Sequence, residues 1–335
     1  MNDNSLRRYD GYVAATVRCA GRDALAELYH LHRRIARGFG VLVYHSIASP
    51  EVDPWSLAVS PEHFDGQLVA LGRSARFVRL EREVTRSRLT WLRRSDQRIA
   101  ITFDDGYADN LHTALPILER HDAPATIFVA TAFLDRPYFW WDRLAALVLS
   151  SSVPAGDLVA AARHAGLRLG IETADDRPRA HDELHGQLVG RELAEIDDLI
   201  DRLSTGLNKF DDLDAARPLT TDELVELADH PLISIGTHTA THPHLTWLDR
   251  SAAIDEIRLG AERLDALLGP SQRSLAYPYG DAGRSTARIA RDLGFDHAVT
   301  TRPGWVGFLD DRRLIPRLRT SDVDGDSLVR QLARG

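Results

Sequence analysis

The chain has 335 residues, which at roughly 150 residues per domain fits two domains or one α/β barrel with insertions. Hydrophobic residues make up 44% and charged residues 27%, as in an ordinary globular protein, and the net charge of −8 argues against a nucleic-acid partner. The single cysteine, Cys19, excludes an internal disulfide framework and a cysteine-rich metal site, whereas 14 histidines leave a histidine-based metal site open.

Residues 1–38 are predicted to form an N-terminal helical extension, because leucines and isoleucine recur there at roughly helical spacing. Charged residues interrupt the apolar runs of this segment, so it shows no signal-peptide pattern. No stretch of the sequence approaches the length of a membrane span. We therefore expect a cytoplasmic protein without an integral membrane segment, and the oligomeric state stays open.

Short apolar runs bounded by loop residues recur along residues 39–335, as is typical of strands buried on both faces of a parallel sheet. These predicted strands are Val41–His45, Phe77–Leu80, Ile99–Phe103, Ala125–Ala130, Leu232–Gly236, Ser274–Tyr277 and His297–Thr301. Helical patterns alternate with them, which indicates βα units. The sequence thus predicts an α/β fold, a distorted (β/α)7-type barrel.

Two helices are predicted most clearly between these strands. One starts after Asp249 or Ser251 and stops at Gly269-Pro270, with an apolar stripe made by Ile254, Ile257, Ala261, Leu264 and Leu268. The other covers about Ala108 to His121. Residues from about 136 to 230 interrupt the alternation with amphipathic helices, so we expect a helical insertion within the barrel.

Asp104 and Asp105 follow an apolar strand and precede Gly106. Neighbouring side chains at a strand end point in different directions, so one carboxylate can bind a cation while the other stays free as a base. Asp and Gly are also favoured in helix caps and turns, and on this motif alone that reading is the stronger one.

His238 and His242 lie four residues apart, directly after another predicted strand. On a helical turn both imidazoles can reach one ion. A carboxylate and two imidazoles suit Zn²⁺, and they also suit Fe²⁺, Co²⁺ or Ni²⁺. A polar loop with exposed histidines is the alternative for this motif taken by itself.

Tyr277-Pro278-Tyr279-Gly280 forms a third strand-end motif, whose loop could present a backbone N–H to an oxyanion or simply make a β-to-α turn. Tyr44-His45 also follows a strand. In a βα barrel the carboxyl ends of the strands gather on one face, where active sites form. The sequence therefore predicts that these motifs converge.

This combination resembles the polysaccharide deacetylase family, carbohydrate esterase family four. The matching residues are Thr102–Tyr107, His238–Pro243 and Ala276–Gly280, in the same order and strand context. The resemblance implies a distorted (β/α) barrel in which Asp105, His238 and His242 bind one divalent metal ion, with Zn²⁺ first and Co²⁺ or Ni²⁺ as alternatives. It further implies that Asp104 is the general base and that the backbone N–H of Tyr279 helps to hold the oxyanion.

Two features depart from the family pattern. The arginine that orients the base in many members is absent from the third motif, where Tyr277 stands, and the usual late histidine acid is not evident. His45 resembles an early Tyr-His motif of the exopolysaccharide branch, so we expect it to be the general acid, with a structural strand-end histidine as the alternative. Arg317 is a candidate to replace the missing arginine.

The substrate-binding residues predicted on this basis are Tyr277, Trp141 and Arg317. Tryptophans near strand ends or the insertion are candidate sugar platforms, although a tryptophan is more often a core residue. They are Trp140, Trp141, Trp247 and Trp305.

The function expected from the sequence is a metal-dependent hydrolase that removes an N-acetyl group from an amino sugar or from a glycan or precursor that contains one. Hydrolysis of another amide or of an acetyl ester would use the same groups. A non-haem iron enzyme shares the two-histidine, one-carboxylate ligand set. An inactive carbohydrate-binding relative is a further alternative.

Overall fold

The computed structural model of the chain describes residues 38–86, 97–150, 153–171, 173–205, 207, 216–270 and 273–334. The predicted N-terminal extension, residues 1–38, lies almost wholly outside the described residues. Among the described helices none is both long enough and apolar enough to cross a membrane.

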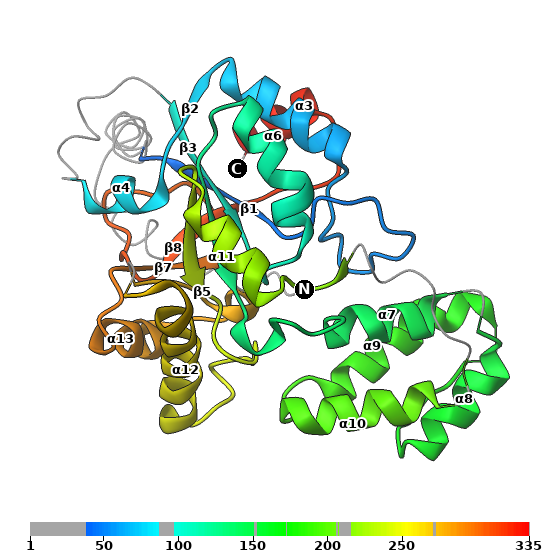
Figure 1. Cartoon of the computed structure of the whole chain (residues 1–335). Helices are drawn as coiled ribbons and strands as arrows, with labels where there is room; N and C mark the ends of the chain where they lie inside the picture. The colour runs from blue at the N-terminus through cyan, green and yellow to red at the C-terminus, as the bar shows by residue number, and fades with distance from the viewer. Residues whose placement is uncertain are drawn as a thin grey trace, which may run out of the picture.

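Within the described residues, eight parallel strands form the centre of the molecule (Figure 1). They are β1 (Gly40–Tyr44), β2 (Ala75–Phe77), β3 (Gln97–Phe103), β4 (Ala125–Val129), β5 (Ile233–Thr237), β6 (Ser274–Ala276), β7 (His297–Pro303) and β8 (Ile315–Arg319). The order runs from β3 through β8 to β1, and β1 pairs back onto β3, which closes a seven-stranded barrel. β2 lies outside this ring, beside the first half of β3. The predicted α/β barrel is thus confirmed.

The helices around the barrel bury their apolar sides against it. They are α3 (Pro61–Gly72), α4 (Leu80–Thr85), the π-helical turn η1 (Asn110–Ala114), α6 (Leu115–Arg120), α11 (Thr221–Asp229), α12 (Arg250–Leu268), α13 (Arg284–Asp292) and α14 (Gly325–Arg334). Asp249 caps α12 by accepting a hydrogen bond from the Ala252 amide at 2.9 Å, and the helix ends before Gly269, as its sequence predicts.

Between β4 and β5 the chain leaves the barrel and forms a helical insertion, drawn as the green lobe in Figure 1. It contains α7 (Trp140–Leu149), α8 (Ala155–His164), α9 (Arg177–Leu188) and α10 (Leu193–Ser204), and it follows the short turn η2 (Thr131–Phe133). These helices share an apolar cluster of their own, whereas α11 contributes to the cluster around the barrel. We therefore propose that the insertion ends before α11.

Strand alternation decides which residues face the barrel interior. Apolar side chains from six strands contact one another there: Val41, Ala100, Phe128, Ala276, Val299 and Ile315. Because side chains alternate along a strand, Thr102 and Asp104 continue the inward row of Ala100, and Arg317 continues that of Ile315. The interior therefore becomes polar towards the carboxyl ends of the strands, where the predicted motifs lie.

Two strand predictions need correction. The run Phe77–Leu80 is not a strand, because β2 ends at Phe77 and α4 begins at Leu80. The strand β8 was not predicted at all. Its sequence carries Pro316 and two arginines, so it lacks the apolar run that marks the other strands.

Candidate active site

Asp104 and Arg317 form a buried ion pair inside the carboxyl end of the barrel. Two nitrogens of the Arg317 guanidinium donate to the two carboxylate oxygens of Asp104 at 2.7 and 2.5 Å. The same guanidinium donates to the Thr102 hydroxyl at 3.1 Å and to the Thr300 carbonyl at 2.8 Å. Burial raises the pKa of Asp104, but the charge and hydrogen bonds of Arg317, together with His238 and His45, outweigh that effect and hold the pKa well below its usual range. Asp104 is therefore an oriented, ionised carboxylate.

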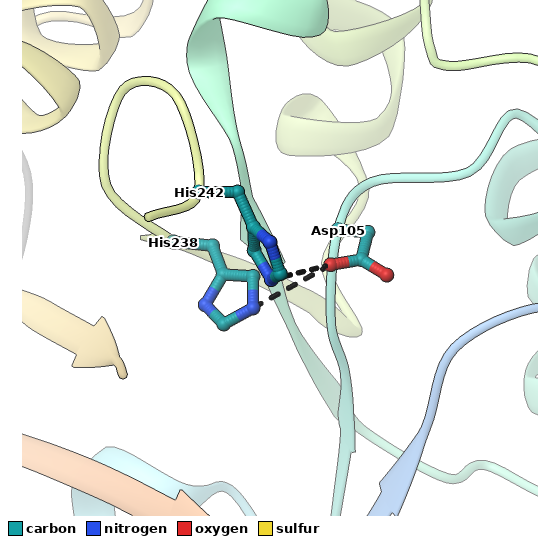
Figure 2. A group of neighbouring side chains, drawn as sticks. All are labelled: Asp105, His238 and His242. Carbon is teal, nitrogen blue, oxygen red and sulfur yellow. Dashed lines mark ion pairs between the residues drawn. The ribbon is translucent and has the colours of Figure 1, made fainter. Parts of the chain in front are cut away.

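Asp105, His238 and His242 point towards one another, as Figure 2 shows. Asp105 directly follows Asp104 in the sequence, so this cluster adjoins the ion pair. The Nε2 atoms of both histidines lie 3.5 Å from Oδ1 of Asp105. Ligand atoms about 2.0–2.2 Å from one tetrahedral ion are separated by roughly 3.3–3.6 Å, which is longer than an ordinary hydrogen bond. The spacing fits three ligands of a shared cation.

The protonation chemistry of the three residues also fits a cation. The His238 Nδ1–H donates to the Ala276 carbonyl at 2.8 Å, which leaves the Nε2 lone pair directed at Asp105. Burial lowers the pKa of both histidines, so both are neutral donors. Burial and the charges of Asp104 and Asp142 raise the pKa of Asp105 well above its usual value. Oδ1 of Asp105 has no hydrogen-bond partner among the described residues. A bound cation would favour its charged form.

The loop that carries the two histidines is fixed from α12. The Glu256 carboxylate accepts hydrogen bonds from the amides of Ala240 and Thr241, at 3.2 and 2.9 Å, and from the Thr241 hydroxyl at 2.8 Å. Gly260 on the same helix lets it approach the loop, since a Cβ there would lie 2.6 Å from the Thr239 backbone. Glu256 was not predicted from the sequence, because no local motif links it to the histidines.

The site also concentrates unusual backbone conformations. Asp105, Thr239, His242 and Tyr279 adopt φ angles of 71°, 67°, 62° and 58°, in the left-handed region that most side chains avoid. Such conformations persist where the surrounding structure enforces them, and they cluster at functional sites.

Tyr279 lies in the short turn η5 (Pro278–Gly280) after β6. The first N–H groups of such a turn have no carbonyl partner within it, so the Tyr279 amide suits an oxyanion contact. Gly280 adopts φ 68°, and a Cβ there would lie 1.9 Å from the Thr301 hydroxyl oxygen. The shape of the turn thus depends on glycine at this position.

His45 follows β1 on the same face of the barrel. Burial lowers its pKa to about 4, while the nearby charge of Asp104 raises it and those of Arg317 and His238 lower it. The His45 imidazole thus interacts electrostatically with the ion pair and with His238. The general-acid role remains a proposal.

The three residues predicted to bind substrate are all buried. The Tyr277 side chain lies in the core, and its hydroxyl donates to the Arg313 carbonyl at 2.9 Å. The Arg317 side chain is fully buried and holds Asp104, the role expected of the missing arginine. Trp141 packs against His242, with ring centroids 5.0 Å apart, and donates from Nε1 to the Tyr107 hydroxyl. We therefore do not retain Tyr277 or Arg317 as sugar contacts.

A stack of aromatic rings leads from the site to the surface. The ring of Tyr279 contacts that of His242 at 4.6 Å and lies parallel to His244, with centroids 3.8 Å apart. His244 in turn stacks on Trp247 at 4.0 Å. Trp247 is 60% exposed, although His244 stacks on its ring and Gly190 of the insertion lies close to the same ring.

Comparisons with known proteins identify the family. Residues 92–298 match the family model described as polysaccharide deacetylase. The chain is 22% identical over 264 residues to a Bacillus subtilis (strain 168) protein named "Putative polysaccharide deacetylase YxkH". That match covers 79% of this chain and 64% of the relative, so the chain corresponds to less than two thirds of its length. The chain belongs to the polysaccharide deacetylase family.

Solved structures share the fold. The Streptococcus pyogenes deacetylase PplD, determined in complex with acetate, aligns over 88% of this chain and 97% of its own, with TM-score 0.56 and 19% identity. IcaB from Ammonifex degensii aligns over 89% and 96%, with TM-score 0.53 and 19% identity. A de-N-acetylase from Aggregatibacter actinomycetemcomitans aligns over 88% and 99%, with TM-score 0.55 and 15% identity.

Proposed function

We propose that this protein is a metal-dependent hydrolase that removes the N-acetyl group of an amino sugar in a glycan or glycan precursor. The observation that carries the proposal is the convergence of Asp105, His238 and His242 next to the Asp104–Arg317 pair. Family membership supports deacetylation as the reaction.

The metal ligands in this proposal are Asp105, His238 and His242. A divalent cation bound there, Zn²⁺ before Co²⁺ or Ni²⁺, would polarise the acetamide carbonyl and lower the pKa of water. The protein itself supplies neutral imidazoles and a fixed carboxylate for it. It also keeps the Asp104 carboxylate out of this ligand set, because Arg317 binds both of its oxygens.

Asp104 is the proposed base. It is ionised and fixed in orientation, and it removes a proton from the water that attacks the acetyl carbon. The Tyr279 amide donates to the oxygen that gains negative charge. Breaking the C–N bond then releases acetate and leaves an amine that needs a proton.

His45 is the proposed carrier of that proton. Because burial holds its pKa at about 4, the imidazole is neutral at pH 7 and must first gain a proton. Once Asp104 has taken a proton from water, its carboxyl group can supply that proton to His45, with which it interacts electrostatically. Transfer through His45 to the leaving nitrogen returns both residues to their starting states.

An N-acetylated sugar is the proposed substrate. One of the proteins with a similar structure is a de-N-acetylase, and another is a deacetylase with bound acetate. The exposure of Trp247 supports a sugar contact, because pyranose rings stack on aromatic side chains. We include a cytoplasmic location in the proposal.

The alternatives differ in the chemistry they need. An acetyl ester or another amide could use the same groups. A non-haem iron oxygenase needs the three ligands but has no use for a second carboxylate held by an arginine, so the Asp104–Arg317 pair favours hydrolysis.

The decisive experiment is mass spectrometry of N-acetylated sugars, oligosaccharides and sugar nucleotides incubated anaerobically with the Zn²⁺-loaded protein. We expect loss of one acetyl group and release of acetate. Asp104→Asn should lower kcat about 100-fold or more while Zn²⁺ still binds. Asp197→Asn, which removes a partly exposed carboxylate paired with Arg136 on the insertion, is the matched control. Cleavage of acetyl esters alone, or turnover only with oxygen and iron, would contradict the proposal.

A further inference from the structure

Asp142 is a carboxylate that the helical insertion brings to the active site. It lies in the first turn of α7, where the positive end of the helix dipole favours a negative charge. The Tyr107 hydroxyl, from the strand-end motif that contains Asp105, donates to Asp142 Oδ2 at 2.9 Å. Trp141 donates to that same hydroxyl at 3.0 Å and packs on the ring of His242. Asp142 is thus joined to the metal-ligand residues through two buried aromatic side chains.

The charges around Asp105 show that Asp142 lies close to the site. Asp142 and Asp104 both raise the pKa of Asp105, and Asp142 and Asp105 both raise that of Tyr107. Asp104 is held by Arg317 inside the barrel, whereas Asp142 lies on helix α7 of the insertion. The site therefore has a third carboxylate, Asp142, which is neither a proposed metal ligand nor the proposed base.

Asp142 differs in its hydrogen bonds from Asp53 and Asp109, the two carboxylates whose charges raise its pKa. Asp53 accepts from the amides of Leu57 and Ala58, one on each oxygen. Both oxygens of Asp109 also accept hydrogen bonds, from neighbouring residues of the β1 and β3 loops. Asp142 accepts only from Tyr107, and within the described part of the chain no hydrogen bond reaches its Oδ1.

An ionised Asp142 with a hydrogen bond on only one of its two oxygens is unfavourable without a ligand. Burial and the charges of Asp53 and Asp109 raise the pKa of Asp142 to about 7, even though Tyr107 stabilises the ionised form. A carboxylate in such surroundings gains most from a cationic or strongly donating partner. Asp142 is only partly buried, so such a partner can reach it from solvent.

We propose that Asp142 binds the amino sugar: its Oδ1 accepts a hydrogen bond from a donor group of the substrate, and its carboxylate pairs with the ammonium group that hydrolysis leaves on the sugar. This inference rests on the proposed deacetylase reaction. There, water adds its oxygen to the acetyl carbon, the C–N bond breaks, acetate leaves, and the amine takes up a proton to become ammonium. A negative charge beside that nitrogen stabilises the product cation.

Binding of glucosamine oligomers tests the inference without turnover. Calorimetry with the Zn²⁺-loaded protein compares these cationic oligomers with neutral cello-oligosaccharides of equal length. The wild-type protein should bind the glucosamine oligomers more tightly. Asp142→Asn should weaken their binding about tenfold or more, because the amide keeps the shape and the Tyr107 contact but loses the charge. Its affinity for the cello-oligosaccharides should change little.

Two further variants separate the effect of the Asp142 charge from effects of changing the insertion or the hydrogen bond from Tyr107. Asp197→Asn removes a carboxylate elsewhere on the insertion, where it pairs with Arg136, and should leave the preference for glucosamine oligomers intact. Tyr107→Phe removes the hydrogen bond to Asp142 but keeps its carboxylate, and should retain most of that preference. A wild-type protein without the preference, or an Asp142→Asn variant that keeps it, would overturn the inference.

The inference and the proposed function fail in different ways. If glucosamine oligomers bind through Asp142 but no N-acetylated sugar releases acetate, the proposed reaction is wrong and the sugar contact stands. If acetate is released normally and Asp142→Asn has wild-type KM and wild-type affinity for the glucosamine oligomers, the proposed reaction stands and the role of Asp142 is wrong.

Discussion

Arg317 and Asp104 are 213 residues apart in the sequence, yet the guanidinium of one contacts both carboxylate oxygens of the other. The two side chains are 0% and 3% exposed, so each is the main counter-charge of the other inside the barrel. Breaking such a buried pair on one side leaves an uncompensated charge, which costs far more than the pair contributes as a whole. The two residues should therefore behave as one unit.

We predict that Arg317→Met lowers the free energy of unfolding by about 3–5 kcal/mol, because it leaves the Asp104 charge buried alone. Urea denaturation measures this loss. In a double-mutant cycle with Asp104→Asn, the combined variant should lose less stability than the sum of the two single variants. Additive losses would show that the residues are not coupled. Arg317→Lys keeps the positive charge but not the two-point contact, so it should lose less stability and still lower kcat.

Metal binding predicts a change in stability as well as in activity. Because the ligands lie on loops that only folding brings together, a cation stabilises the folded chain by RT ln(1 + [L]/Kd), about 2.7 kcal/mol at a concentration of 100 Kd. Zn²⁺ should raise the melting temperature, and a chelator should reverse the rise. His242→Ala should abolish this rise, and His230→Ala, a surface histidine beside Glu119, is the control. An equal rise in His242→Ala would place the Zn²⁺ elsewhere.

His45→Gln tests the proposed proton carrier. The amide retains polarity but cannot take up and release a proton, so kcat should fall about 100-fold or more. The rise in melting temperature with Zn²⁺ should persist, because His45 is not among the three ligands. Near-normal turnover by His45→Gln would exclude the role and leave Asp104 to supply the proton itself.

The motifs that could be predicted from the sequence are those whose partners lie within a few residues. Asp104 and Asp105 follow a plainly apolar strand, and His238 and His242 follow another. Since the carboxyl ends of barrel strands share one face, strand position was enough to predict that these residues meet. The predicted metal cluster is the same Asp105, His238 and His242 group that the structure brings together.

The contacts that could not be predicted join residues with no shared local pattern. Arg317 could be suggested only as a replacement for the arginine missing from the third motif. Its strand β8 carries Pro316 and two arginines, so its sequence does not resemble that of a buried strand. Glu256 and Asp142 lie on helices whose packing against the site depends on the tertiary fold. Tyr277 was predicted to bind substrate, but the sequence could not indicate that its side chain is buried and that its hydroxyl donates to the Arg313 carbonyl.

The hydrogen bonds at the start of α11 should make the stability of the protein depend on pH. Glu223 accepts from Arg217, and with Thr220 it forms a capping box. The adjoining carbonyl of Arg217 accepts from the Ala108 amide, next to the Asp104–Tyr107 motif. Hydrogen bonds from Arg217 outweigh burial and lower the pKa of Glu223. Its contribution is therefore complete above the unfolded pKa, near 4.3, and is lost as the pH falls through the lowered folded value.

We accordingly expect Glu223→Gln to lower the free energy of unfolding by about 1–2 kcal/mol at pH 7. The difference from the wild type should shrink as the pH falls from about 4 towards 2, because the wild-type carboxylate then becomes protonated. Denaturation at a series of pH values measures this. Glu226→Gln, an exposed position on the same helix, is the control. A difference that stayed constant down to the lowest pH would show that the charge of Glu223 is not its source.

Trp247 tests whether the ring stack beside the site binds sugar. Its exposed side chain adjoins a stack that reaches His242 through His244 and Tyr279, so a sugar unit next to the one being deacetylated could rest on it. Trp247→Ala should lower kcat/KM for an N-acetylated oligosaccharide about three- to tenfold, and should affect a monosaccharide less. Because Trp247 is 60% exposed, the folded state should lose little stability. Leu309→Ala, which removes another exposed apolar side chain, is the control. An equal loss on both substrates would mean that Trp247 supports the loop that carries His242 and does not bind the neighbouring sugar unit.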